Sequence, residues 1–272
     1  MATDLSGRVI VITGGGTGIG RATALACARA GMHVALGARR LDKLEAVADE
    51  IRAIGSKASA VRCDVASAED CAGLLDAAED QLGPVFAAFA NAGYGFEAPF
   101  VETSDERIAE ILDVNFYGSL RLIRPAIERM RTNGEGHAIF CSSCLSKLGV
   151  PYYAPYCTSK AAQDHAARSL RHELAPEGIA VSSVHPVGTR TEFFETAREN
   201  SGGSTLSDRT PNSMLQPPER VAKRIVKQLR KGTGAEIWTG FDKRFAFAAA
   251  VMFPGLADRL MRRMVARRQP TD

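Results

Sequence analysis

A tyrosine and a lysine four residues apart, Tyr156 and Lys160, stand at the start of a stretch with helical character, directly after Pro155. Side chains at positions i and i+4 of a helix lie on one face, so a phenol and an ammonium at this spacing can contact the same small molecule. An ammonium near a phenol favours its phenolate, which lets tyrosine act as a general acid and base. Taken alone, the same pair is also typical of an ordinary amphipathic helix. The other motifs of the sequence are needed to distinguish a catalytic pair from such a helix face.

The composition is that of an ordinary globular chain with one large apolar core. It has 272 residues, of which 45% are apolar and 24% are charged, and a formal net charge of +3. The last 17 residues carry that charge by themselves, with five arginines against two aspartates. The rest of the chain is therefore neutral and offers no broad basic face, so we expect no nucleic-acid partner.

We expect a cytoplasmic chain without a bound metal. Asp4 and Gly7 interrupt the N-terminus before any apolar run begins, which is unlike a signal peptide. No run approaches the roughly 20 apolar residues that span a bilayer. Cys141 and Cys144 form one C-x-x-C pair, but no second pair or histidine pair accompanies them. That pattern does not favour a zinc site, and the other four cysteines are expected to be reduced and at least half-buried.

Short apolar runs alternate with longer helical patterns along most of the chain. The apolar runs are 8–13, 33–37, 58–62, 85–90, 137–142 and 179–184. The helical patterns are 19–30, 41–53, 67–82, 104–131 and 156–175. Continuous apolar runs are typical of strands that are buried on both faces, and the alternation predicts βαβ units with right-handed crossovers. We therefore expect an α/β fold with a parallel sheet.

Beyond these units the sequence predicts three further elements. A long, polar, Gly/Ser-rich segment at 192–216 is expected to be a mobile substrate loop or lid. A helix at 218–231 and a strand at 236–240 follow it. We expect residues 1–244 to form a single domain.

Residues 245–272 are expected to form a basic amphipathic extension. A nine-residue apolar run is followed by Leu256, Leu260 and Met264 at i+4 spacing, with arginines between them. Such a segment can lie on a membrane surface, cover a pocket or pack into a partner subunit. Because the rest of the chain is neutral and the apolar run is long, we prefer packing against protein to peripheral membrane contact.

Three glycines stand between the first predicted strand and the first predicted helix. Gly14, Gly18 and Gly20 have the spacing G-x-x-x-G-x-G. Glycines at this place allow a tight turn and let backbone N–H groups approach a pyrophosphate at the helix N-terminus. Such a pattern can also mark a turn alone, but its position inside the first βαβ unit favours a dinucleotide site.

The end of the second predicted strand indicates which dinucleotide is bound. An acidic residue there holds the adenosine ribose hydroxyls of NAD(H), whereas arginine accommodates the 2′-phosphate of NADP(H). The sequence has Arg39 and Arg40 here and no carboxylate before Asp42. We therefore predict that NADP(H) is preferred over NAD(H). The alternative is two solvated arginines at the start of a helix.

Five further motifs follow these glycines in a fixed order. They are C-D-V at 63–65, N-A-G at 91–93, D-V-N-F-Y-G at 113–118, S-S at 142–143 and Y-C-T-S-K at 156–160. In this combination residues 6–192 resemble the classical short-chain dehydrogenase/reductase family. The resemblance implies a Rossmann fold, with a doubly wound seven-stranded parallel sheet flanked by helices, and a homodimer or homotetramer.

The resemblance also implies a catalytic group of four residues. Tyr156, which follows Ser143 by the family spacing of 13 residues, is expected to donate and accept the proton. Lys160 is expected to lower the pKa of Tyr156 and to bind the nicotinamide ribose, while Ser143 orients the substrate oxygen. Asn115 is expected to complete a proton relay, with its backbone carbonyl at a helix irregularity and a water between it and Lys160.

For the cofactor, the resemblance places Asp64 and Val65 near the adenine and Asn91 against the sheet beside the cofactor. Thr191 matches a threonine expected near the nicotinamide carboxamide or a phosphate. The whole expected cofactor set is Gly14, Gly16, Thr17, Gly18, Ile19, Gly20, Arg39, Arg40, Asp64, Val65, Asn91, Ala92, Gly93, Tyr156, Lys160, Pro186, Thr189 and Thr191.

The apolar pattern supports an inward position for Asn115 independently of the family. In the predicted helix at 104–131, an apolar stripe leads to Asn115, whose amide then needs buried partners. The alternative is a core asparagine without a role in chemistry. The helix is expected to begin with a capping box of Thr103 and Glu106.

Two positions depart from the family pattern. Val187 stands where a glycine is usual, and it would be strained if the backbone there had a positive φ. Ser146 replaces a frequent glycine on the substrate side of the expected pocket.

The expected function is that of an NADP(H)-dependent oxidoreductase acting on CH–OH groups. Large apolar side chains fall in the segments around the expected nicotinamide position: Tyr94, Phe96, Leu145, Leu148, Val150, Tyr152, Phe193 and Phe194. No basic cluster accompanies them, since Lys147 stands alone, so we expect an apolar ketone, aldehyde or secondary alcohol as the substrate. The alternative is a sensor or scaffold protein on the same fold, which has no need of Ser143, Tyr156 and Lys160 together.

Overall fold

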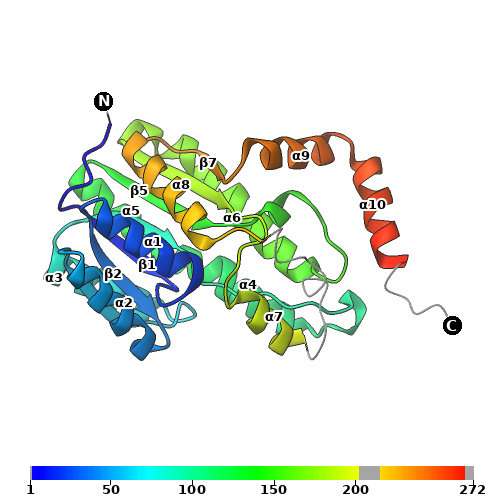
Figure 1. Cartoon of the computed structure of the whole chain (residues 1–272), viewed down its shortest axis with the longest axis horizontal. Coiled ribbons are helices and arrows are strands. Elements are labelled where there is room, and N and C mark those ends of the chain that lie inside the picture. The colour runs from blue at the N-terminus through cyan, green and yellow to red at the C-terminus, as the bar shows by residue number, and fades with distance from the viewer. Residues whose placement is uncertain (1, 202–214, 267–272) are drawn as a thin grey trace.

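In the computed structural model the chain forms a seven-stranded parallel sheet with helices on both faces (Figure 1). The structure describes residues 2–201 and 215–266. The strands are β1 (Val9–Thr13), β2 (His33–Ala38), β3 (Ala58–Arg62), β4 (Val85–Ala90), β5 (Gly136–Cys141), β6 (Ile179–His185) and β7 (Glu236–Trp238). They lie in the order β3-β2-β1-β4-β5-β6-β7, and each neighbouring pair is parallel. The predicted doubly wound α/β fold is confirmed.

The helices divide between the two faces of the sheet. One face is covered by α1 (Gly18–Arg29), α2 (Leu41–Ala53) and α8 (Pro218–Lys231). The other is covered by α3 (Ala68–Leu82), α5 (Gly118–Asn133) and α6 (Ala154–Glu173). Further helices are α4 (Asp105–Leu112), α7 (Phe193–Ser201), α9 (Phe241–Met252) and α10 (Pro254–Ala266), and a 3₁₀ turn, η3 (Cys144–Lys147), follows β5.

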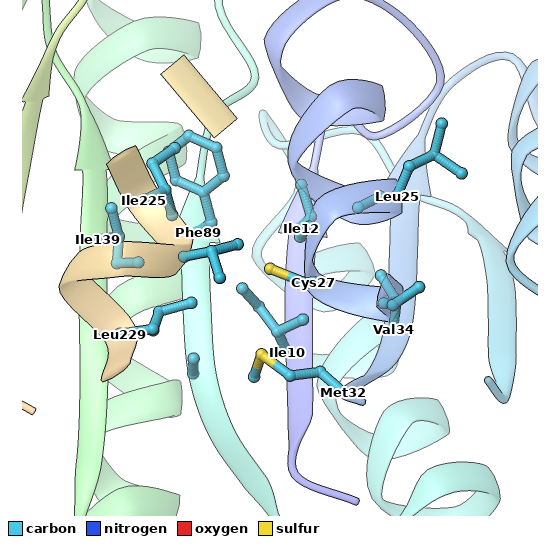
Figure 2. Packing of buried hydrophobic residues seen from close by; sticks show 14 of the residues in the cluster. Ile10, Ile12, Leu25, Cys27, Met32, Val34, Phe89, Ile139, Ile225 and Leu229 are labelled. Carbon is cyan, nitrogen blue, oxygen red and sulfur yellow. The ribbon is translucent and has the colours of Figure 1, made fainter. Parts of the chain in front are cut away.

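Alternating side chains of β1 contribute to both apolar cores. Ile10 and Ile12 pack with α1, α2 and α8, whereas Val9 and Val11 pack with α3 and α5. Figure 2 shows the first core, in which Ile225 of α8 lies with the strand residues. Burial of each large aliphatic side chain stabilises the fold by about 1.5–3 kcal/mol. The two cores therefore hold the strands, and the loops at their carboxyl ends, in fixed positions.

The direction in which strands are added reverses between β1 and β4. From β1 the chain proceeds to β2 and β3 on one side, whereas β4 begins the half that continues to β7 on the other side. At such a point the loops that leave the two strands diverge and open a crevice beyond the carboxyl ends. The glycine-rich turn after β1 and the N-A-G segment after β4 both lie there.

One predicted helix, 104–131, is interrupted in the structure. α4 ends at Leu112, a π turn covers Asp113–Tyr117, and α5 begins at Gly118. A π turn holds one residue more than an α-helical turn, and such turns are frequent at functional sites. The irregularity implied for the region of Asn115 is therefore present.

The expected capping box at the start of this helix is wrong by one residue. The N-cap is Ser104, whose hydroxyl accepts the N–H of Arg107 at 3.4 Å. Thr103 instead donates its hydroxyl to the carbonyl of Pro99 at 3.0 Å. The Thr103 side chain thus stabilises the turn that precedes the helix, and the next residue, Ser104, is the N-cap.

The segment predicted as a loop or lid, 192–216, begins with a helix, α7, which the sequence pattern did not indicate. Ala197 is buried, and the Ser201 hydroxyl accepts the N–H of Glu97 at 2.8 Å. The segment is mostly polar, so its sequence did not indicate a helix with a buried face. The rest of the predicted loop, residues 202–214, lies outside the described residues.

Two helices, α9 and α10, extend from the end of the sheet at β7 (Figure 1). The ring of Phe247 lies 5.8 Å from that of Trp238, which anchors α9 on β7. Large apolar side chains that stay exposed on this extension are Phe245, Val251, Met252, Phe253, Leu256 and Leu260. Among the described helices, none combines the length and the apolar character needed to cross a bilayer.

Candidate active site

The turn after β1 depends on its glycines. Gly14 and Gly18 have φ values of 65° and 54°, in the left-handed region that favours glycine. A Cβ atom on Gly20 would lie 2.1 Å from the carbonyl oxygen of Gly14, so no larger residue fits there. Thr17 precedes α1 without a side-chain capping bond, which leaves the first N–H groups of the helix to other partners. This tight turn against a helix N-terminus fits a dinucleotide pyrophosphate.

Three more of the predicted cofactor residues lie around this turn. A Cβ atom on Gly16 would lie 3.1 Å from the Cβ of Lys43, so the turn also approaches α2 closely. Ile19 is half-buried against the core below the turn. A Cβ atom on Gly18 would lie 3.0 Å from Cγ2 of Thr191, which brings the segment after β6 directly to the glycine turn.

The segment after β6 is fixed by hydrogen bonds to its neighbours. The carbonyl of Pro186 accepts the N–H of Cys144 at 3.1 Å. The side-chain amide of Gln216 donates to the carbonyl of Val187 at 2.7 Å and to the hydroxyl of Thr189 at 3.3 Å. These bonds hold residues 186–191 between the glycine turn and η3.

The strain considered for Val187 is absent. Within the described part of the chain, Tyr152 is the only residue other than glycine with a φ in the left-handed region, at 68°. Val187 therefore takes a backbone conformation that any residue can adopt, and the usual glycine is not needed there. The strained position is instead Tyr152, in the loop that leads into α6, where no sequence pattern indicated it.

Asn91 joins the ends of β1 and β4. Its side-chain amide donates to the carbonyls of Thr13 at 3.0 Å and of Gly14 at 3.2 Å. Its backbone N–H donates to the hydroxyl of Thr13 at 3.1 Å, and the N–H of Ala92 does so at 3.3 Å. The N-A-G segment is thereby fixed at the point where the strand order reverses.

The loop after β3 contains Asp64 and Val65. The backbone N–H of Asp64 donates to the carboxylate of Asp70 at 2.8 Å, and its own carboxylate accepts the N–H of Ala66 at 3.0 Å. Val65 is buried, and its carbonyl accepts a hydrogen bond from Arg121 at 3.2 Å. These bonds order the loop beside the end of β2, which is the neighbour of β3 in the sheet.

The two arginines after β2 differ in their surroundings. Arg40 forms an ion pair with Glu192 at 2.8 Å, which links the start of α2 to the residue before α7. Arg39 is exposed at the end of β2. Of the two, Arg39 is therefore the better candidate for binding a phosphate, because Arg40 already pairs with a carboxylate.

The four predicted catalytic residues are buried close together. Ser143 follows β5, Tyr156 and Lys160 lie on α6, and Asn115 lies in the π turn, each with at most 7% of its surface exposed. The ammonium of Lys160 lies 5.7 Å from the centre of the Tyr156 ring and donates to the carbonyl of Cys141 at 2.8 Å. The spacing of Tyr156 and Lys160 thus brings both side chains to one buried site.

The environment of Tyr156 favours its protonated form in this arrangement. Burial raises the pKa of Tyr156 above its ordinary value, and a hydrogen bond with Ser143 opposes this shift only in part. The ring of Phe193 lies 5.5 Å from that of Tyr156 and contributes to its burial. This direction is opposite to the one that a role as a base requires, so the phenolate needs a positive charge near it.

The side chain and the carbonyl of Asn115 are both bonded. Its Oδ1 accepts the N–H of Tyr94 at 2.9 Å, and its Nδ2 donates to the hydroxyl of Ser159 at 3.0 Å. Its carbonyl accepts hydrogen bonds from Ser119 and Gln163, each at 2.7 Å. The link from Asn115 toward Lys160 therefore passes through a side chain, that of Gln163, where the resemblance implies a water.

An apolar cluster lies around Tyr156. Of the eight large apolar residues predicted for the pocket, five belong to it: Tyr94, Phe96, Leu145, Val150 and Phe193. Phe96 is 1% exposed and so is a core residue rather than a free pocket wall. Phe194 stacks edge-to-face on Phe193 at 5.8 Å, and Tyr153, which the sequence pattern did not indicate, is also in the cluster.

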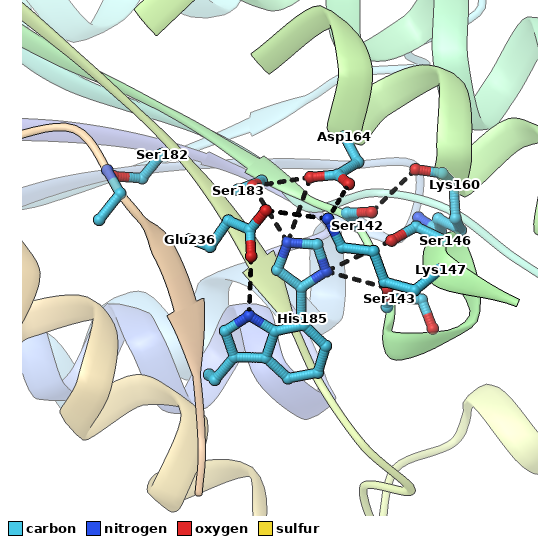
Figure 3. Close-up of polar contacts among 12 residues, drawn as sticks. Ser142, Ser143, Ser146, Lys147, Lys160, Asp164, Ser182, Ser183, His185 and Glu236 are labelled. Atoms are coloured by element: carbon cyan, nitrogen blue, oxygen red, sulfur yellow. Dashed lines mark hydrogen bonds and ion pairs between the residues drawn. The ribbon is translucent and has the colours of Figure 1, made fainter. Parts of the chain in front are cut away.

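A cluster of charged side chains, in which Asp164 and His185 are buried and Lys147 and Glu236 are partly buried, adjoins the backbone of Ser143 (Figure 3). Lys147 donates to Oδ2 of Asp164 at 2.6 Å and to Oε1 of Glu236 at 2.9 Å. Nε2 of His185 lies 3.2 Å from Oδ1 of Asp164, and its Nδ1 lies 3.1 Å from the carbonyl oxygen of Ser143. The cluster thus connects α6, β6 and β7 to the residue that is predicted to orient the substrate.

Hydrogen bonds set the charge state of this cluster. Burial alone would raise the pKa of Asp164, but hydrogen bonds from His185 and Lys147 hold it well below its ordinary value. Burial would likewise raise the pKa of Glu236, and hydrogen bonds from Lys147 and Trp238 lower it. Both carboxyl groups are therefore ionised at neutral pH. Lys147, the lone cation expected near the pocket, is thus compensated by two carboxylates.

Comparison with known proteins agrees with this architecture. The family profile described as short chain dehydrogenase matches residues 8–202. A short-chain type dehydrogenase/reductase from Mycobacterium marinum has a TM-score of 0.77 and 34% identity, over 88% of this chain and 96% of that one. An alcohol dehydrogenase from Thermococcus sibiricus, solved with 5-hydroxy-NADP, has a TM-score of 0.73 and 28% identity, over 85% and 94%.

The chain belongs to the short-chain dehydrogenase family, as predicted, and is an oxidoreductase that acts on CH–OH groups with a nicotinamide cofactor. It is also similar to glycine betaine reductase ATRR of Emericella nidulans, with 34% identity over 227 residues. That alignment covers 84% of this chain and 18% of the relative, so the chain spans less than a fifth of the length of that protein.

Proposed function

We propose that the protein is an NADP(H)-dependent oxidoreductase that interconverts an apolar ketone or aldehyde and the corresponding alcohol, with Tyr156 as the general acid and base. The observation that carries this proposal is the burial of Ser143, Tyr156, Lys160 and Asn115 together beside the glycine turn. Gly93 supports the same view, because a Cβ atom on it would lie 2.8 Å from Oδ1 of Asn115 and 3.4 Å from Nζ of Lys160.

The cofactor, when bound, supplies or accepts a hydride at the carbon that bears the oxygen. In reduction, the hydroxyl of Ser143 donates a hydrogen bond to the substrate oxygen as negative charge develops on it. Tyr156 transfers its phenolic proton to that oxygen, and in oxidation the phenolate takes the proton back. Because burial raises the pKa of Tyr156, Lys160 is needed to stabilise the phenolate.

The residues that would hold the cofactor lie along the edge of the sheet that the carboxyl ends of the strands form. The N–H groups at the start of α1 would hold the pyrophosphate, and the loop with Asp64 and Val65 would receive the adenine. Lys160 would bind the nicotinamide ribose, and Thr191 lies where the segment after β6 meets the glycine turn. The solved alcohol dehydrogenase with 5-hydroxy-NADP supports the choice of an NADP-type cofactor.

The apolar cluster around Tyr156 supports the substrate class. Tyr94, Leu145, Val150 and Phe193 pack against the cluster that contains Tyr156, and the charge of Lys147 is already compensated by two carboxylates. We expect turnover of NADPH with apolar ketones or aldehydes, measured at the nicotinamide absorbance against α-keto acids of matched size. Preferential reduction of the keto acids would contradict the proposed substrate class.

Arg39 is expected to set the preference for NADP(H). A guanidinium–phosphate contact is a charge-assisted hydrogen bond that contributes about 1.5–3 kcal/mol, which is roughly tenfold to a hundredfold in binding. Arg39→Asp should therefore weaken NADPH binding by that factor and leave NADH binding nearly unchanged, as measured by fluorescence titration of both cofactors.

Arg29→Asp provides a control with the same change of charge. Arg29 is exposed in the last turn of α1, at the opposite end of the helix from the glycine turn. This variant should bind both cofactors like the wild type. Tighter binding of NADH than NADPH by the wild type would overturn the assignment.

The exposed apolar side chains of α9 and α10 are expected to be covered by a second copy of the chain. Replacing Phe253, Leu256 and Leu260 together by serine should then shift the sedimentation velocity of the protein toward that of a monomer. Arg259→Gln with Arg262→Gln is the contrasting variant, because it removes attraction to anionic lipid and keeps the apolar residues. Binding of the wild type to anionic vesicles that the arginine variant loses would contradict packing against protein.

A further inference from the structure

Gln163 is a buried amide for which the proposed mechanism has no role so far. It lies on α6, three residues after Lys160, and is fully buried. Its Oε1 accepts a hydrogen bond from Nζ of Lys160 at 3.0 Å. Its Nε2 donates to the carbonyl of Asn115 at 2.7 Å and to the hydroxyl of Ser119 at 2.6 Å. One side chain thus joins Lys160 directly to Asn115.

The partners of Gln163 permit only one orientation of its amide. The carbonyl of Asn115 can only accept, and the hydroxyl of Ser119 gives its own hydrogen to that same carbonyl at 2.7 Å. Both groups therefore need the N–H donors of Gln163. The ammonium of Lys160 can only donate and needs the amide oxygen. Rotating the amide by half a turn would disrupt all three bonds, so the link is rigid.

Lys160 depends on this link for one of its two acceptors. Its ammonium donates to the carbonyl of Cys141 and to Oε1 of Gln163. Burial lowers the pKa of Lys160, so each acceptor that stabilises the ammonium helps to keep it charged. The same two acceptors fix the position of Nζ relative to the ring of Tyr156.

We propose that Gln163 is a positioning residue, which keeps Lys160 charged and in place for Tyr156 and connects it to Asn115 through a side chain. This inference rests on the proposed function, in which Lys160 stabilises the phenolate of Tyr156. The hydrogen bonds of Gln163 go to Lys160, Asn115 and Ser119, so its effect on Tyr156 passes through Lys160.

Two substitutions separate this role from simple filling of the core. Gln163→Leu keeps most of the side-chain volume and removes both polar atoms. Gln163→Ala opens a space that is lined by the Asn115 carbonyl, the Ser119 hydroxyl and the Lys160 ammonium, which are enough partners for a water. If Gln163 only fills space, the leucine variant should retain more activity and more stability than the alanine variant. If it positions Lys160, the alanine variant keeps more activity, because a water can restore the link.

We expect kcat on an accepted substrate to fall about tenfold in Gln163→Leu and by less in Gln163→Ala, since the hydrogen bond to the ammonium is lost in the former and is replaced by one to a water in the latter. Thermal stability should follow the opposite order, with the alanine variant lower. Gln228→Leu is the matched control, because Gln228 is a buried glutamine on α8 that donates to the carbonyl of Thr233. It should lower stability and leave kcat unchanged.

The pH dependence of kcat distinguishes the two roles, because a loss of packing alone would not shift it. The titratable groups that face Lys160 are Tyr156 on the same helix and the thiol of Cys141 at the end of β5, whereas Asn115 and Gln163 do not titrate. A less stabilised ammonium favours the phenolate less, so the acidic limb of kcat for alcohol oxidation should move up by about one pH unit in Gln163→Leu.

An unmoved pH profile, or a leucine variant more active than the alanine variant, would overturn the role of Gln163. Failure of the proposed function has a different signature, which is turnover by the wild type that does not depend on Tyr156. The two outcomes are distinguishable in the same set of assays.

Discussion

Replacing Tyr156 by phenylalanine is expected to lower turnover by about two orders of magnitude or more, the usual contribution of one general acid–base group. The change removes only the phenolic hydroxyl, and the ring keeps its contact with Phe193 at 5.5 Å. We therefore expect the fold and the affinity for NADPH to remain those of the wild type. The measurements are kcat and kcat/KM on an accepted substrate, with a fluorescence titration of NADPH.

Tyr153 offers a matched control for this experiment. It is also buried, its ring lies 6.3 Å from that of Tyr156, and it directly precedes α6. Tyr153→Phe likewise removes one hydroxyl from the apolar cluster and should leave turnover nearly unchanged. Near wild-type turnover in Tyr156→Phe would show that Tyr156 and Lys160 only form a helix face. An equal loss in both variants would indicate a packing effect instead of proton transfer.

Replacing Lys147 by methionine is expected to destabilise the fold by about 3 kcal/mol at neutral pH, because it leaves the buried Asp164 and the partly buried Glu236 without their shared cation. The side chain of Asp164 is only 4% exposed, so water compensates its charge poorly, whereas Glu236 at 19% keeps some contact with water. The free energy of unfolding from urea titration measures this change. Lys57→Met, at an exposed position, is the control and should change stability by no more than about 0.5 kcal/mol.

The pH dependence of this loss has a definite sign. Asp164 and Glu236 have lowered pKa values in the folded wild type, so their contribution to stability is fully present above the ordinary carboxyl range and is lost as pH falls from that range through the lowered values. In Lys147→Met the same groups can bind protons on acidification, which removes the uncompensated charge. The difference between variant and wild type should therefore shrink below about pH 4–5. A difference that stays constant with pH would exclude the loss of charge compensation as the cause.

The positions of the strands could be predicted because each apolar run is buried on both faces. Each of the six strands predicted before residue 190 differs by no more than one residue at either end from the strand in the structure. The interruption of the helix at Asp113–Tyr117 could not be predicted from periodicity, because residues on both sides of it keep helical patterns. α7 was missed because its one fully buried residue, Ala197, is small and stands among polar neighbours.

The parts of the site that are local in sequence could also be predicted. Tyr156 and Lys160 share a helix face, and the glycine turn occupies eight consecutive residues. The charged cluster could not be predicted in the same way, because Lys147 and Glu236 are 89 residues apart and meet only through the order of the strands. Gln163 and Asp164 did carry a signal, since they are polar residues one turn after Lys160 on its own helix, but their partners lie on other elements.

The π turn makes the site sensitive to the length of the chain as well as to the identity of its residues. The extra residue rotates everything after it by about 100° relative to an uninterrupted α-helix. Deleting one residue within 113–117 would let α4 and α5 join into a regular helix. Either Asn115 or the buried face of α5 would then point away from its present partners. Replacing the exposed Tyr117 should change little here, because it alters no chain length. Insertions and deletions are the changes that this segment cannot accept, so relatives that share the site should align through it without a gap.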